Sequence, residues 1–221
     1  MIKYKNLTMI GTSHIAIQSI DEVESFILKE KPGFVALELD KKRFFSLLYK
    51  ERKLRLSDIK ELGLRVFLLN FFGSWIEKKL GERVGIKPGS EMRKAIECSK
   101  KVGSRIYLID QDIKITLKNL LKTPFTEFLK LILDSILGVI FRRETIKIDL
   151  RKVPKKSIIN KVLSTVKHRY PNIYKSLIDD RNKIMAKSLI RLMSLNKQAS
   201  ILAIVGAGHE DGIIKIIKNE V

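Results

Sequence analysis

The chain has 221 residues, of which 45% are hydrophobic and 31% charged, a composition that excludes an intrinsically disordered protein. A chain of this length can bury one sizeable core, so we expect one domain over residues 1–221. The 44 Lys and Arg residues exceed the 24 Asp and Glu residues and give a net charge of +20. This surplus indicates either an anionic partner or a thermophilic composition with solvated surface charges.

The single cysteine, Cys98, excludes a disulfide framework and a cysteine-rich metal site, and it fits a reducing compartment. The first residues lead into an apolar run and lack the features of a signal peptide. We therefore expect a cytoplasmic location, for a whole protein or for the soluble domain of a membrane-anchored one. The basic residues are spread along the chain without a nucleic-acid-binding motif, so a nucleic-acid partner is not expected.

Four short apolar runs resemble strands that are buried on both faces, because each is rich in Ile, Val or Leu. They are residues 7–10, 34–39, 105–109 and 201–205. Segments with helical spacing separate them, at residues 21–31, 41–53 and 91–102. This order predicts an α/β fold with a layered, central, mostly parallel sheet and flanking helices. Ser19 or Asp21 is the expected N-cap of the first helix, and Gly103 the C′ residue of the third.

A helical insertion is expected over about residues 113–195, in helices at residues 113–122, 124–141, 155–170 and 173–193. The window 125–141 is the most apolar, but its 17 residues include three charges, which is unsuited to a membrane span. We expect it to pack on the core or to lie against a partner or a membrane surface. Residues 64–80 fit a strand or, more readily, a helix with an apolar face. Exposed apolar faces on these windows would favour a homodimer.

Two Gly-x-x-His segments, Gly11-Thr-Ser-His14 and Gly206-Ala-Gly-His209, each follow a predicted strand. They contain two of the three histidines of the chain. A lone histidine at a turn is usually a hydrogen-bonded structural residue, and His168, on a polar helical stretch, is expected at the surface. The matched placement instead favours a shared site, because the carboxyl ends of parallel strands meet at one edge of a sheet.

Carboxylates are expected at the same edge. Glu38 and Asp40 stand at the end of the second predicted strand, and Asp110 and Asp112 follow the third. Imidazole and carboxylate suit Zn²⁺, Mn²⁺ or Fe²⁺, and such an ion acidifies a bound water. A carboxylate that does not touch the ion would then serve as a general base.

Two further residues have both an ordinary and a functional interpretation. Glu91 follows a Pro-Gly turn at a helix start, where it either complements the helix dipole or presents a carboxylate to the site. Arg181 stands near the start of a long predicted helix. No Gly-x-Ser-x-Gly motif occurs and Cys98 has ordinary neighbours, so neither a serine nor a cysteine nucleophile is indicated.

The order of these motifs resembles the TraB/PrgY (pheromone shutdown) family, which is grouped with the Tiki and GumN proteins and, more distantly, with the ChaN and erythromycin-esterase groups. The resemblance extends over residues 7–217 and suggests an archaeal thermophile. The segments that carry it are Gly11-Thr-Ser-His14, Glu38-Leu-Asp40 with Arg43, Gly89-Ser-Glu91-Met92, Leu108-Ile-Asp110, Asp112-Ile-x-Ile-Thr-Leu-Lys118, Arg181-Asn-x-x-Met-Ala186 and Gly206-Ala-Gly-His209 with Gly212-Ile.

The resemblance implies an α/β fold like that of the ChaN and erythromycin-esterase groups, with a pocket built from both Gly-x-x-His motifs. Tiki members resemble metal-dependent proteases. By this resemblance, His14 and His209 would ligate a divalent ion, which is Mn²⁺, Co²⁺ or Zn²⁺. Glu38 and Glu91 would be further ligands or the general base.

By the same resemblance, Arg181 would stabilise an oxyanion or a substrate carboxylate, or Arg43 would do so in its place. The chain departs from the family at Gln111, where members often carry arginine, so one positive charge near the pocket is missing. Prokaryotic members also tend to be longer, with hydrophobic C-terminal helices that span the membrane. The positive charge of this chain would suit the anionic cytoplasmic face of a bilayer.

The expected function is a divalent-metal-dependent hydrolase, a peptidase with a peptide substrate. The alternative is a non-catalytic module that binds and sequesters a peptide or another ligand, as PrgY-like members degrade or sequester a pheromone. A third candidate is an adaptor at a nucleic acid or a membrane surface, driven by the net charge of +20.

Overall fold

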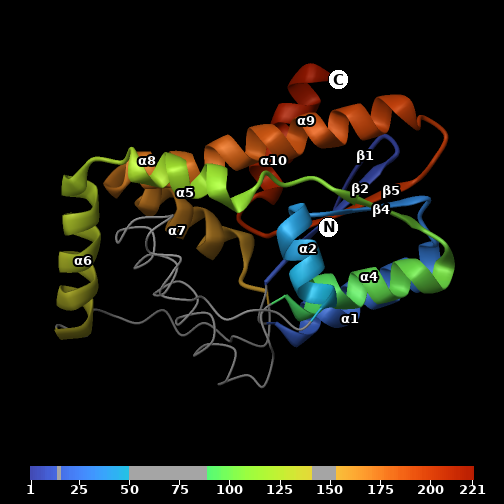
Figure 1. Cartoon of the computed structure of the whole chain (residues 1–221), viewed down its shortest axis with the longest axis horizontal. Coiled ribbons are helices and arrows are strands. Elements are labelled where there is room, and N and C mark those ends of the chain that lie inside the picture. Colours follow the sequence, from blue (N-terminus) through green and yellow to red (C-terminus); the bar gives the residue numbers. More distant parts are fainter. Residues whose placement is uncertain (14–15, 50–88, 141–152) are drawn as a thin grey trace.

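The computed structural model describes residues 1–13, 16–49, 89–140 and 153–221. Their five-stranded sheet has the order β1-β2-β5-β3-β4 (Figure 1). The parallel strands are β2 (Leu7–Thr12), β5 (Ile201–Gly206), β3 (Phe34–Leu37) and β4 (Arg105–Leu108). Strand β1 (Ile2–Tyr4) pairs antiparallel with β2. The predicted α/β fold with a mostly parallel sheet is confirmed.

Strand β5 is the centre of the sheet, and all of its residues are buried. It pairs with β2 on one side and β3 on the other, so that Ile201 lies opposite both Leu7 and Phe34. Helices cover both faces of this strand, which explains why its sequence is apolar throughout rather than alternating.

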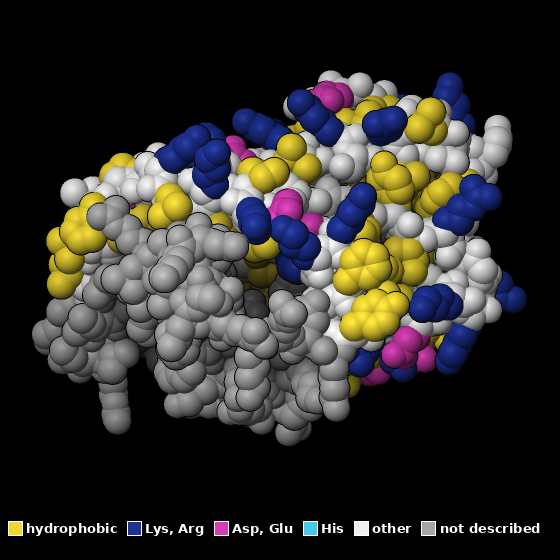
Figure 2. Space-filling view, viewed as in Figure 1, with side chains coloured by type: hydrophobic (Ala, Val, Ile, Leu, Met, Phe, Trp, Pro, Cys, Tyr) yellow, Lys and Arg dark blue, Asp and Glu magenta, His cyan; other side chains and the backbone are white. Residues whose placement is uncertain are grey.

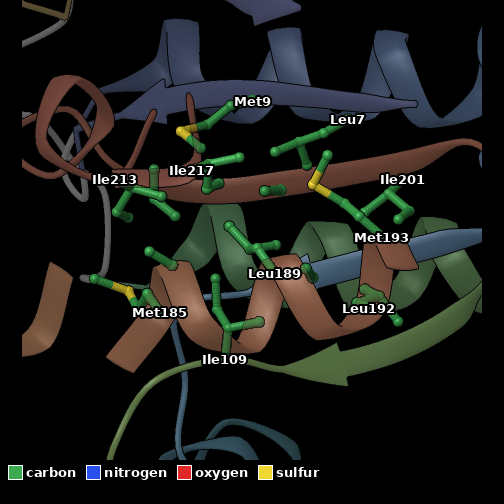
Figure 3. Close-up of a cluster of buried hydrophobic side chains, with 14 residues drawn as sticks. Leu7, Met9, Ile109, Met185, Leu189, Leu192, Met193, Ile201, Ile213 and Ile217 are labelled. Atoms are coloured by element: carbon green, nitrogen blue, oxygen red, sulfur yellow. The ribbon is translucent and has the colours of Figure 1, made fainter. Parts of the chain in front are cut away.

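One face of the sheet is covered by α1 (Ile17–Glu30) and α4 (Ser90–Val102). The other face is covered by α9 (Asp180–Leu195) and α10 (Glu210–Glu220). Figure 1 shows α9 on the opposite side of the sheet from α1 and α4. Figure 3 shows the α9–α10 side, whose labelled side chains are Leu7, Met9, Ile109, Met185, Leu189, Leu192, Met193, Ile201, Ile213 and Ile217. Their burial ties the two ends of the chain to one apolar core.

The remaining helices of the described residues include α2 (Lys41–Leu48), after β3, and a group inserted between β4 and β5. That group is α5 (Ile113–Leu121), α6 (Phe125–Ile140), α7 (Lys156–Arg169), α8 (Pro171–Tyr174), a π-helical turn η1 (Lys175–Asp179) and α9. It has a small apolar core of its own, formed by Leu117, Leu120, Phe128, Tyr170 and Ile173. Over the described part of residues 113–195, the predicted helical character is therefore confirmed.

Several local predictions need correction. The N-cap of α1 is Ala16, so neither Ser19 nor Asp21 caps it; Ser19 is buried inside the helix, and its Oγ accepts a hydrogen bond from the Ser13 N–H at 2.9 Å. The predicted helix at 173–193 is interrupted by η1. Strand β1 was not predicted, whereas Gly103 does end α4, with a φ of 78°. The ambiguous window 64–80 lies outside the described residues.

None of the helices within the described ranges combines the length and the apolar character needed to cross a membrane.

Candidate functional site

The carboxyl ends of the parallel strands bring polar residues together at one edge of the sheet. Thr12, at the end of β2, lies opposite Gly206, at the end of β5. Glu38 directly follows β3, and its N–H donates to the Ile204 carbonyl at 3.1 Å. Asp110 follows β4 after one buried residue. This is the edge at which ligands bind in open α/β sheets.

Arg181, in the first turn of α9, is the centre of the polar cluster. Its Nη2 donates to Asp110 Oδ2 at 2.6 Å and also to Glu38 Oε1. Its Nε lies 3.2 Å from both Asp110 oxygens. Burial alone would lower the pKa of Arg181, but the carboxylates of Glu38 and Asp110 raise it above its ordinary value. The guanidinium is therefore a fixed positive charge between two buried carboxylates.

Glu38 connects β3 with β5 just beyond the last residue pair of these two strands, Leu37 with Ile204. Its side chain is 4% exposed, and Oε2 accepts a hydrogen bond from the Gly206 N–H at 2.6 Å. A charged acceptor makes this bond stronger than a neutral one. The carboxylate thus holds the start of the Gly206–His209 segment against β3.

His209 is held by contacts with both of its ring nitrogens. Its Nδ1 lies 2.6 Å from Asn182 Oδ1, and its Nε2 lies 3.2 Å from Arg181 Nη1. Because arginine can only donate, the network assigns the lone pair to Nε2 and the proton to Nδ1. His209 Nε2 is also 3.5 Å from Glu38 Oε1. His209 is buried, with 5% of the residue exposed, and these partners fix the orientation of its ring.

Asn182 fits its place only because residue 212 is glycine. A Cβ at Gly212 would lie 2.2 Å from Asn182 Nδ2, which is far inside contact distance. Asn182 itself is 5% exposed. The close approach of α9 to α10 thus sets the position of the imidazole.

A second layer of charges surrounds Asp110. Arg43 donates from Nη2 to Asp110 Oδ2 and from Nε to Asp40 Oδ2, the latter at 2.8 Å. Asp40 caps α2 by accepting from the backbone N–H groups of Lys42 and Arg43. The Asp40 carboxylate therefore has a structural role, although it lies at the same edge of the sheet.

Asp112 has a similar structural part. It caps α5 through the Lys114 N–H at 2.8 Å, and Lys42 Nζ lies 3.0 Å from its Oδ2. The hydrogen bond from the Lys114 backbone, followed by the bond from Lys42, lowers the pKa of Asp112. Gln111 is buried and donates to Thr116 Oγ1 at 2.7 Å. Gln111 is therefore bonded to α5 and adds no charge to the polar cluster.

A cavity of about 320 Å³ opens beside the cluster. Its described lining residues are Thr12, Ser13, Glu38, Pro154, Ile159, Arg181, Gly206, Ala207, Gly208 and His209. A neighbouring cavity of about 280 Å³ shares Gly208 with it and is also lined by Asn182. Polar groups therefore form one wall of the first cavity, and apolar side chains from the start of α7 and the segment before it add to another.

The structure brings together three of the predicted site residues: Glu38, Arg181 and His209. Arg43 reaches the same cluster through Asp110. Glu91 is 1% exposed in the first turn of α4 and is not among the residues that line the cavity. His14, the other predicted metal ligand, lies outside the described residues. His168 is exposed, as expected.

Asn182, which contacts His209, was not predicted from the sequence as a site residue. Its neighbour Arg181 was selected because it stands at a helix start, and Asn182 belongs to the same motif. Only the packing of α9 on α10 shows that its amide faces an imidazole.

The residues fit a divalent ion in two respects. Glu38 Oε1 and His209 Nε2 are 3.5 Å apart, close to the roughly 3.4 Å between two ligands of one tetrahedral ion with bonds of about 2.1 Å. The Nδ1–H of His209 also donates to the amide oxygen of Asn182, as the second ring nitrogen of metal-bound histidines commonly does. Within the described residues, however, no group of three or more His, Cys, Asp or Glu side chains is arranged to hold an ion.

A family model and the names of two relatives both point to TraB proteins. The model of the TraB/PrgY/gumN family matches residues 2–220. An uncharacterized protein of Methanocaldococcus jannaschii is 42% identical over 221 residues, which cover 96% of this chain and 53% of the relative. The TraB domain-containing proteins of Mus musculus and Homo sapiens are 24% and 23% identical, over 94% of this chain and 61% of each relative. The chain thus spans between about half and three fifths of the length of these relatives.

Proposed function

Since this chain belongs to the TraB/PrgY/gumN family, and since its polar cluster borders a cavity, we propose that it is a hydrolase that cleaves peptides with the help of a divalent metal ion. Mn²⁺, Co²⁺ and Zn²⁺ are the candidate ions. The observation that carries the proposal is the 3.5 Å separation of Glu38 Oε1 and His209 Nε2 on the cavity wall. His14 is the expected third ligand, and Glu91 a further ligand or the general base.

The proposed ion would acidify a water molecule and polarise the scissile carbonyl when bound. The other contributions come from the chain itself. Asn182 keeps His209 in the tautomer whose lone pair is on Nε2, the atom that a cation requires. Arg181 would donate to an oxyanion once its Nη atoms give way to the ion at Glu38 and His209, while its Nε stays bonded to Asp110.

The cavity walls support a peptide rather than a bulky substrate. Gly206 and Gly208 present backbone without side chains, which lets an extended chain approach the cluster closely. Pro154 and Ile159 supply apolar surface for a substrate side chain. A volume of about 320 Å³ suits a few residues of a peptide at a time.

The test combines metal analysis with peptide cleavage. We expect the purified chain, reloaded after chelation, to retain one ion and to release products from a peptide library that mass spectrometry detects. His209→Ala and Glu38→Gln should each lose both the ion and cleavage. His168→Ala and Glu220→Gln are the matched controls, because both side chains are exposed elsewhere. Unchanged metal content in both site variants would overturn the metal assignment.

One observation favours a second candidate, a pocket that binds and sequesters a peptide without cleaving it. Arg181 contacts both Glu38 and His209, so a cation can join these two side chains only after the guanidinium moves. If the guanidinium stays, the cavity offers donors and backbone but no ion. This candidate predicts saturable peptide binding with intact peptide recovered afterwards, and it is refuted by any His209-dependent product.

A further inference from the structure

The outer face of α6 carries apolar side chains in a regular row. Phe125, Leu129 and Leu133 follow one another at intervals of four residues and are 58%, 45% and 48% exposed. Their spacing places them on one side of the helix, whereas Glu127 and Phe128 are buried on another side. In Figure 1, α6 stands at one end of the molecule, and Figure 2 shows a run of hydrophobic side chains down that end. Exposed apolar rows of this kind mark interaction surfaces.

The basic and acidic residues of α5 and α6 differ in their exposure and in their partners. All four basic residues of these two helices and their link, Lys114, Lys118, Lys122 and Lys130, are exposed. Lys114, Lys118 and Lys122 repeat at the same interval of four residues, and only residues 123 and 124 separate Lys122 from the apolar row.

Both acidic residues of this stretch are bonded to groups at the end of α7 and the start of α8. Glu127 is 6% exposed and accepts hydrogen bonds from the backbone N–H groups of Asn172 and Ile173 at the start of α8. Asp134 binds Arg169 and the Tyr170 hydroxyl. Within residues 113–140, the four lysines are therefore the fully exposed charges.

We infer that these two rows, which we name the α5–α6 face, bind the surface of an anionic lipid bilayer. The face comprises Phe125, Leu129 and Leu133 together with the four lysines named above. Apolar side chains would enter the headgroup boundary while the lysines pair with anionic headgroups. A second copy of the chain fits less well, because two identical lysine rows would repel. The exposed apolar row of α6 also suits a lipid bilayer, because a bilayer needs no groove of complementary shape.

The inference does not depend on the hydrolase proposal, and vesicle flotation tests it with the full chain. We expect binding to vesicles of phosphatidylcholine with phosphatidylglycerol, weak binding to phosphatidylcholine alone, and a loss of binding as salt rises. Each lysine near such a surface contributes about fivefold in affinity, so Lys114→Gln with Lys118→Gln and Lys122→Gln should weaken binding by about a hundredfold. Leu129→Glu with Leu133→Glu should weaken it at least tenfold.

Matched controls separate this face from the net charge of the protein. Lys183→Gln with Lys187→Gln and Lys197→Gln removes the same charge from exposed positions elsewhere, and Leu195→Glu changes a leucine that is 72% exposed. Both controls should bind like the original chain, with circular dichroism confirming the fold of every variant. Equal losses in the two lysine triples, or no binding to anionic vesicles, would overturn the inference. So would a dimer in sedimentation velocity that the leucine pair abolishes, because it would assign the face to a second copy.

Discussion

Replacing Gly212 with alanine should change the stability of the protein in a direction that depends on Asn182. The new Cβ would lie 2.2 Å from Asn182 Nδ2, so the amide must move away from His209 and lose the 2.6 Å hydrogen bond. Losing a buried hydrogen bond costs about 1–3 kcal/mol. Alanine inside α10 recovers about 1 kcal/mol of helix propensity. The net effect of Gly212→Ala is thus a destabilisation of about 0–2 kcal/mol.

In an Asn182→Ala background the same substitution should stabilise the protein by about 1 kcal/mol, because the clash is gone while the helix propensity remains. Urea unfolding of the four proteins in this double-mutant cycle gives the coupling free energy, which we expect at about 1–3 kcal/mol. Nitrogen chemical shifts of His209 report the tautomer in parallel. The reasoning is refuted if Gly212→Ala stabilises both backgrounds equally, since Asn182 would then not be confined by α10.

Three further predictions concern the other charged groups. Arg181→Lys should destabilise the fold by about 1–3 kcal/mol in urea unfolding, because one ammonium cannot reach Glu38, Asp110 and His209 together. Arg191 is exposed on the same helix, so Arg191→Lys should change the free energy of unfolding by less than about 0.5 kcal/mol. Equal effects of the two substitutions would contradict this role of Arg181. The hydrogen bond from Lys156 lowers the pKa of Asp211 below 3.8. This contact between α7 and α10 therefore stabilises the fold above pH 3.8, and the stabilisation is lost as the pH falls through the lower pKa of the folded state. The NMR titration midpoint of Asp211 should rise in Lys156→Met, and an unchanged midpoint would refute the contact. Tyr170→Phe should cost about 1 kcal/mol by removing the bond to Asp134, whereas Tyr49→Phe, at a residue 66% exposed, should cost almost nothing.

The sheet could be predicted because its strands are buried on both faces, so their apolar runs are continuous. Strand β5 illustrates this, with every residue buried. Strand β1 escaped prediction because it is an edge strand of three residues with no fully buried position. The α1 N-cap was misplaced because Ser19 lies inside the helix, and its hydroxyl accepts from the Ser13 N–H rather than from a backbone N–H of the first helical turn.

The site was predictable to the extent that it follows from strand ends. Glu38 and His209 were placed by the rule that parallel strands share a carboxyl edge, and they do meet there. The position of Arg181 between them depends on how α9 crosses that edge, which no local pattern encodes. Whether Glu91 and His14 join the same site stays a prediction.

The position of β5 also has a consequence for biosynthesis. The strand lies between β2 and β3 in the sheet, yet it follows both of them in the chain by more than 160 residues. Until the ribosome releases residues 201–206, β1 with β2 and β3 with β4 can form only two separate pairs, each with an unpaired apolar edge. The nascent chain therefore passes through a long stage that is exposed to aggregation, and chaperone protection at that stage should matter more than for a fold whose central strand is made first.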